Sequence, residues 1–125
     1  SLKMKTSNDP RHIKRQHTVQ ELFKIQFHKQ PLSDRAKEVL MHQDILDARI
    51  HDAASEFPID KINRVDLAIL RLAVFELLIE KKEPVNVIID EAVELGKEFG
   101  GDASPSFING ALGNIINHEK PSKNT

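Results

Sequence analysis

The central apolar segment of the chain, residues 64–78, reads RVDLAILRLAVFELL. Apolar residues recur there at the three- and four-residue spacing of an α-helix, and they occupy nearly the whole helix circumference. A helix that is apolar on almost every side is buried among other helices. We therefore predict that residues 60–82 form the central helix of the fold.

Two charged residues, Arg71 and Glu76, interrupt this segment. They are five residues apart, so they do not share a helix face as residues four apart would. Because a buried charge is costly unless it is paired, we expect each of them to tie the central helix to a neighbouring element.

Four further helices are predicted on both sides of the central one. They are expected at residues 10–28, 33–54, 84–99 and 104–118. Asp9 before Pro10, Ser33, and Ser104 before Pro105 are typical helix starts, and Gly100 is a typical helix end. No segment alternates apolar and polar residues between turn signals, so the predicted fold class is all-α.

The composition is that of one globular domain. The chain has 125 residues, of which 39% are hydrophobic and 30% charged. We expect one domain at 10–118, a disordered leader at 1–9 and a disordered tail at 119–125.

The sequence contains no cysteine, which excludes disulfides, cysteine–zinc sites and thiol catalysis. No uncharged stretch approaches the roughly 20 residues of a membrane span, and we expect a cytoplasmic protein.

Charge is distributed unevenly along the chain. Residues 1–30 carry a net charge of +5 and the remainder carries −6. Arg11, Lys14 and Arg15 fall within one arc of the first helix, well away from its apolar stripe, so we expect them to share a solvent face. A basic arm on an acidic body is typical of proteins that bind polyanions, although a solvated helix end is equally consistent with composition alone.

Other titratable residues give little support for catalysis. Glu91, Glu94 and Glu98 are expected to form a solvated acidic ridge. The six histidines are scattered and match no metal or catalytic motif, and no glycine-rich phosphate loop occurs. We expect no enzyme activity, no metal and no cofactor.

Several motifs together resemble the NusB family of transcription antitermination factors. After residues 64–78 come VIIDEAVEL at 87–95, Phe99-Gly100, Ser104 and FING at 107–110, in the order and spacing of that family. Residues 11–23 are a looser match to the arginine-rich first helix of the family. The resemblance implies two packed helical bundles with about five to seven helices.

The resemblance also implies a function without chemistry. Family members bind boxA-type single-stranded RNA together with the ribosomal small-subunit protein NusE, and the complex helps RNA polymerase to resist termination. The implied RNA-binding residues are Arg11, His12, Lys14, Arg15, Ser104, Ser106 and Phe107. The implied partner-binding residues are Phe23, Phe27 and Asp66. Asp66 is expected to face solvent or the partner, because an unpaired buried charge is costly.

Departures from the family keep two other functions open. The chain has little room for the short helix that usually separates the first two long ones, and the arginine run is thinned to RHIKR at 11–15. One alternative is a protein–protein adaptor of the same fold, either monomeric or homodimeric, that does not bind RNA. The other is the RNA-binding module of a ribosomal RNA methyltransferase.

Overall fold

The computed structural model describes residues 9–119, which contain six α-helices and no strand. The helices are α2 (Pro10–Lys24), α3 (Asp34–Met41), α4 (Gln43–Ala53), α5 (Arg64–Val74), α6 (Val85–Phe99) and α7 (Ser104–Glu119). A short 3₁₀ turn, η1 (Ile59–Lys61), precedes α5, and a π-helical segment, η2 (Phe75–Glu80), continues it. The predicted leader and tail lie outside the described residues except for Asp9 and Glu119. The predicted all-α fold is confirmed.

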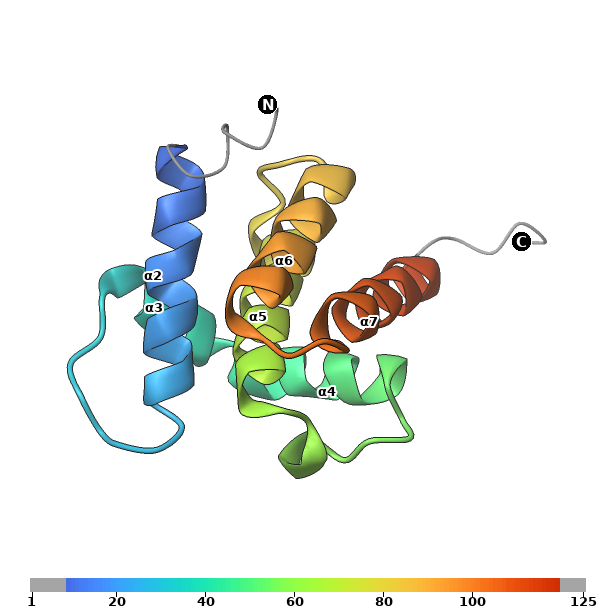
Figure 1. Cartoon of the computed structure of the whole chain (residues 1–125), viewed down its shortest axis with the longest axis horizontal. Helices are drawn as coiled ribbons and strands as arrows, with labels where there is room; N and C mark the ends of the chain where they lie inside the picture. The colour runs from blue at the N-terminus through green and yellow to red at the C-terminus, as the bar shows by residue number, and fades with distance from the viewer. Residues whose placement is uncertain (1–8, 120–125) are drawn as a thin grey trace.

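Helix α5 lies at the centre of the molecule and contacts α2, α4, α6 and α7 (Figure 1). Helix α2 lies on one side of α5 with α3 packed against it, and α6 and α7 pack together on the other side. Helix α4 lies across one end of α5 and contacts α7. The two groups of helices therefore share α5 as their common core.

Burial along α5 agrees with its predicted central place. Every residue from Asp66 to Leu77 is buried, and Leu67, Leu70 and Phe75 are at most 1% exposed. Burying each large apolar side chain contributes on the order of 1.5–3 kcal/mol. This segment is therefore the main source of hydrophobic stabilisation.

Two of the three predicted helix caps, Asp9 and Ser33, are confirmed, whereas the Ser104 hydroxyl accepts from the upstream Gly101 amide. The Asp9 carboxylate accepts a hydrogen bond from the Arg11 amide at 2.9 Å, and Pro10 occupies the first turn. The Ser33 hydroxyl accepts from the Ala36 amide. Such caps satisfy amides that have no partner within the helix.

Three predicted helix boundaries were wrong. Helix α2 ends at Lys24 rather than residue 28, and turns follow it. The predicted helix at 33–54 is divided at His42, whose backbone (φ −105°, ψ 14°) leaves helical geometry where its ring packs 5.7 Å from the Phe75 ring. The predicted helix at 60–82 is interrupted at Asn63, because its side chain caps α5 by accepting from two amides.

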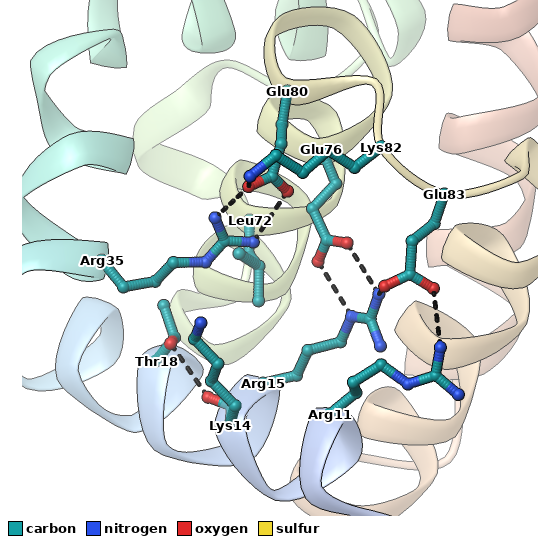
Figure 2. A pocket seen from close by; sticks show the side chains of 10 residues that line it. All are labelled: Arg11, Lys14, Arg15, Thr18, Arg35, Leu72, Glu76, Glu80, Lys82 and Glu83. Atoms are coloured by element: carbon teal, nitrogen blue, oxygen red, sulfur yellow. Dashed lines mark hydrogen bonds and ion pairs between the residues drawn. The ribbon is translucent and has the colours of Figure 1, made fainter.

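The π-helical segment η2 ends the central helix and carries two of its charged residues, Glu76 and Glu80. Its final bond joins the Lys81 amide to the Glu76 carbonyl at 2.9 Å, five residues apart, and Lys81 ends the segment with a left-handed backbone (φ 55°). Glu76 and Glu80 both line the same hollow beside α2 and α3 (Figure 2). Such π segments are frequent at functional sites.

Across residues 9–119, no helix is both long enough and apolar enough to cross a membrane.

Candidate functional site

Arg15 is buried rather than exposed, so the predicted solvent face was wrong for this residue. Its guanidinium donates to both oxygens of Glu76, from Nε at 2.9 Å and from Nη2 at 2.7 Å, and to Glu83 at 3.2 Å (Figure 2). Burial alone would lower the pKa of Arg15, but the hydrogen bonds and charge of Glu76 raise it above its ordinary value. Arg15 therefore joins α2 to η2 and to the loop before α6.

His12 is also buried, at 1% exposure. Its Nδ1 lies 2.7 Å from a Glu91 oxygen, and its Nε2 lies 2.8 Å from a Glu98 oxygen. Burial alone would lower the pKa of His12, but the two carboxylates raise it above its ordinary value. Glu91 is half-buried, so the predicted solvated ridge was wrong for this residue, whereas Glu98 is exposed as expected. Both carboxylates join α2 to α6 through His12.

Two of the four predicted basic residues remain available to a ligand. Lys14 is exposed, and the Arg11 side chain is 70% exposed. Arg11 lies 3.5 Å from Asp9 and 3.8 Å from Glu83. Exposed ion pairs of this kind are worth at most about 1 kcal/mol, so a ligand can displace them.

A hollow of about 160 Å³ lies beside these exposed cations, between α2, α3 and η2 (Figure 2). It is lined by five cations, three carboxylates, Thr18 and Leu72; the charged residues are Arg11, Lys14, Arg15, Arg35, Lys82, Glu76, Glu80 and Glu83. The lining therefore has a net charge of +2. A wider hollow of about 500 Å³ continues between α2 and the start of α3, sharing Lys14, Thr18 and Arg35. We call these two adjoining hollows the basic groove.

Arg35 and Lys82 are members of the basic groove that the sequence analysis missed. Arg35 lies over the Phe75 ring at 5.3 Å and donates to both oxygens of Glu80. This pair raises the pKa of Arg35 and lowers that of Glu80, chiefly through the hydrogen bonds. The sequence shows Arg35 in the first turn of a predicted helix and the Lys81-Lys82 pair after the apolar segment. No sequence spacing indicates that either of them lies beside α2.

The remaining predicted RNA-binding residues lie elsewhere, at the start of α7. Ser104 is buried and accepts from the Gly101 amide at 3.0 Å, whereas Ser106 is exposed. Phe107 is half-buried, with Phe57 packed edge-on at 5.7 Å. The structure thus separates this group from the first turns of α2, which lie near the opposite end of the helical bundle (Figure 1).

The close approach of Ser104 also explains the glycine before it. A Cβ added at Gly100 would lie 2.3 Å from the Ser104 hydroxyl oxygen. The predicted helix end at Gly100 is confirmed, since it follows the last residue of α6. Only glycine fits there without displacing the start of α7.

The predicted partner-binding residues are divided between surface and core. Phe23 and Phe27 pack edge-on at 5.1 Å, and Phe27 is 54% exposed. An apolar hollow of about 170 Å³ adjoins Phe23, with Val65 and Phe99 in its wall. An exposed aromatic side chain beside an apolar hollow is typical of a protein-binding surface.

Asp66 does not face solvent, so that expectation was wrong. It is 6% exposed, and its Oδ1 has no hydrogen-bond partner among the described residues. Burial raises the pKa of Asp66, and a hydrogen bond with Ser104 opposes that shift. Asp66 therefore lies beneath the start of α7.

The structural roles expected for the charges in the central helix are confirmed. Arg71 donates to both oxygens of Asp47 on α4 at 2.9 Å. Glu76 accepts from Arg15 on α2. Elsewhere in the described chain, no group of three or more His, Asp or Glu side chains is arranged to hold a metal ion.

Comparisons with known proteins agree with the arrangement of these helices. The model of the NusB family matches residues 6–117. The transcription antitermination protein NusB of Chloroflexus aggregans (strain MD-66 / DSM 9485) is 38% identical over 110 residues, which cover 80% of this chain and 73% of that protein. Other curated relatives of the same name, 44–47% identical, are matched over 54% of their own length. The chain thus spans about half the length of those relatives.

Two solved structures have a similar fold. The structure of T. maritima NusB is 28% identical, with a TM-score of 0.76 over 90% of this chain and 94% of that one. A structure of antitermination factors NusB and NusE in complex with dsRNA contains a chain that is 19% identical. Its TM-score is 0.74, over 87% of this chain and 98% of the other. By its family match and by its relatives, the chain belongs to the NusB family.

Proposed function

We propose that this chain is an RNA-binding transcription antitermination and termination factor that binds boxA-type leader RNA together with NusE. It would act in the cytoplasm, by binding and not by catalysis, within the antitermination complex of RNA polymerase. One observation carries the proposal: a NusB-family chain presents exposed cations, Arg11 and Lys14, at the edge of the basic groove. The relatives named as antitermination proteins support the same role.

The basic groove fits the phosphate backbone of a single strand. Its excess of cations attracts phosphates, and binding releases counterions. Arg11 and Lys14 are the direct contacts in this proposal because their side chains reach solvent. His12 and Arg15 are positioning residues, since their polar atoms are already bonded to carboxylates.

The start of α7 is proposed as a second RNA contact. Ser106 is exposed there, and the half-buried ring of Phe107 borders the surface. A base could stack on an aromatic ring at this point, which is typical of single-strand recognition. Ser104 would position this turn from below, because its hydroxyl is bonded to the Gly101 amide.

The surface around Phe23 and Phe27 is proposed for NusE. Phe27 presents an exposed ring, and the adjoining hollow accepts an apolar side chain. The net charge of −6 on residues 31–125 favours encounter with a basic ribosomal protein. Asp66 would act indirectly in this proposal, by supporting the α7 start through Ser104.

The test is a titration of the full chain into labelled boxA-type RNA and into a scrambled RNA, with and without NusE. We expect tighter binding to boxA, a further gain with NusE, and a loss of at least tenfold in the Arg11→Ala/Lys14→Ala variant. Lys37→Ala is the matched control, because it removes one exposed charge from α3 that does not line the basic groove.

Equal and weak binding to both RNAs, unchanged by Arg11→Ala/Lys14→Ala, would overturn the proposal. If NusE still bound under those conditions, the chain would be better described as a protein-binding adaptor with this fold.

A further inference from the structure

The His12 side chain bridges two turns of α6. Glu91 and Glu98 are seven residues apart on that helix, and the buried imidazole lies between their carboxylates. Nδ1 lies 2.7 Å from Glu91, and Nε2 lies 2.8 and 3.0 Å from the two oxygens of Glu98. Each ring nitrogen therefore has a carboxylate at hydrogen-bond distance.

This geometry requires the doubly protonated ring. A neutral imidazole carries one N–H, so one of its nitrogens would present a lone pair to a carboxylate at less than 3 Å. Both contacts are attractive only for the imidazolium, which donates from both nitrogens. Loss of one proton would convert one of the two contacts from attraction to repulsion.

Charged groups from α2, α6, η2 and the loop before α6 surround this cluster. On α2, Arg15 lies 3.6 Å from Glu91, and Gln16 donates to Glu98 at 3.1 Å. Arg11 and Arg15 also contact Glu83 in the loop before α6, and Arg15 is bonded to Glu76 of η2. A guanidinium is always charged in proteins, so the imidazole of His12 is the basic group of this cluster whose charge can change with pH.

His12 lies in the helix turn that presents the proposed RNA contacts. Arg11 precedes it, and Lys14 follows it by two residues. Among the described residues, side-chain hydrogen bonds from His12, Arg15 and Gln16 join this end of α2 to α6, η2 and the loop between them. The order of the first turns of α2 should therefore depend on the His12 proton.

We propose that His12 is a protonation-dependent clasp that holds the first turns of α2 against α6 and so makes RNA binding sensitive to pH. The consequence for RNA rests on the proposed function, whereas the clasp itself does not. The proposed RNA contacts Arg11 and Lys14 flank His12 on α2, so the clasp would act on RNA affinity through their positioning.

The direction of the pH effect follows from the sign of the shift. The pKa of His12 is raised above 6.5 in the folded chain. The clasp is therefore complete below pH 6.5 and is lost as the pH rises through the folded-state pKa. Order at the start of α2 should decrease towards alkaline pH.

The first test is nitrogen NMR of the imidazole rings in the full chain, followed from pH 5.5 to 9. We expect both His12 nitrogens to be protonated at pH 6.5 and one of them to lose its proton only at higher pH. Amide hydrogen exchange in residues 12–18, corrected for its intrinsic pH dependence, should accelerate as His12 loses its proton. A His12 ring that titrates at or below pH 6.5, or amide protection independent of its titration, would overturn the clasp.

The second test uses variants and a matched control. Glu98→Gln should lower the pKa of His12 while keeping a hydrogen-bonding side chain, and His12→Gln should abolish the pH-dependent step in α2 protection. His17→Gln, which removes an exposed histidine from the same helix, should leave that step unchanged. If His12→Gln does not fold, the change in the pKa of His12 caused by Glu98→Gln still tests whether the two carboxylates hold the His12 proton.

The third test separates the clasp from the proposed function. Affinity for boxA-type RNA should fall several-fold between pH 6.5 and 8.5 in the wild type, and by less in His12→Gln. The same pH dependence in both proteins would overturn the link to RNA. No RNA binding at any pH would contradict the proposed function and this link, while the NMR result would still decide whether the clasp exists.

Discussion

The two halves of α2 are held to the protein by different forces. The first half is held by ion pairs and hydrogen bonds from His12 and Arg15, both buried, to carboxylates on η2, α6 and the loop between them. The second half is held by apolar packing of Val19 and Leu22, which are at most 2% exposed. Apolar packing is insensitive to pH and tolerates small shifts, whereas the charged half depends on every partner being present.

The two halves of α2 also carry different proposed functions. The charged half keeps Arg11 and Lys14 on the surface while their neighbours are buried. The apolar half continues into the Phe23–Phe27 pair, of which Phe27 is exposed. One helix thus presents a proposed RNA surface at its start and a proposed protein surface at its end.

The largest expected effect comes from breaking the buried pair in the charged half. Glu76→Ala removes the bidentate partner of Arg15 and should destabilise the fold by about 3–5 kcal/mol, as measured by urea unfolding. The double variant Arg15→Met/Glu76→Leu should recover most of this loss, because it leaves no unpaired charge. Equal loss in the single and double variants would show that packing, and not charge pairing, holds this half.

A comparable core substitution tests the apolar half. Leu22→Ala should cost about 2–5 kcal/mol in the same unfolding experiment, because Leu22 is fully buried in the core. Its effect should be constant between pH 6 and 8, unlike that of His12→Gln. A strong pH dependence for Leu22→Ala would mean that the two halves do not act separately.

Asp66 gives a smaller effect with a defined pH dependence. Burial raises its pKa above 3.8, so the charged form destabilises the folded state at neutral pH. Asp66→Asn should stabilise the chain by roughly 1 kcal/mol or less at pH 7. The gain should shrink as the pH falls towards 3.8, because the wild-type carboxyl then becomes protonated. A gain that is independent of pH in thermal unfolding would contradict this assignment.

The smallest effect on stability is expected at the exposed cations. Arg11→Ala should change the free energy of unfolding by no more than about 0.5 kcal/mol, since its ion pairs are solvent-exposed. A loss as large as that of Glu76→Ala would show that Arg11 is structural, as Arg15 is.

The central helix and two of the helix starts could be predicted from the sequence. Residues 66–77 have an apolar pattern that only a buried helix satisfies, and caps such as Asp9 and Ser33 act through neighbours a few residues away. The interruption at Asn63 and the π segment that follows α5 were missed. The interruption depends on the Asn63 cap, and the π segment depends on an extra residue in one helical turn. The spacing of apolar residues reveals neither of them.

The candidate site was predictable by residue type but not by exposure. Arg15 was predicted to face solvent with Arg11 and Lys14, and His12 to contact RNA, because the sequence pattern describes α2 alone. Their carboxylate partners lie between 61 and 86 residues further along the chain, so burial follows from the tertiary arrangement. The tertiary arrangement also places Asp66 beneath α7 and Arg35 in the basic groove.

The most direct test of the central claim is the salt dependence of boxA-type RNA binding by the wild type and by Arg11→Ala/Lys14→Ala. If the two exposed cations contact phosphates, the slope of log affinity against log salt should be less steep by about 1.4 in the variant, from about 0.7 for each contact. Its thermal unfolding should stay within a few degrees of the wild type. An unchanged salt slope would contradict the account, because the start of α2 would then be a structural element without a nucleic-acid surface.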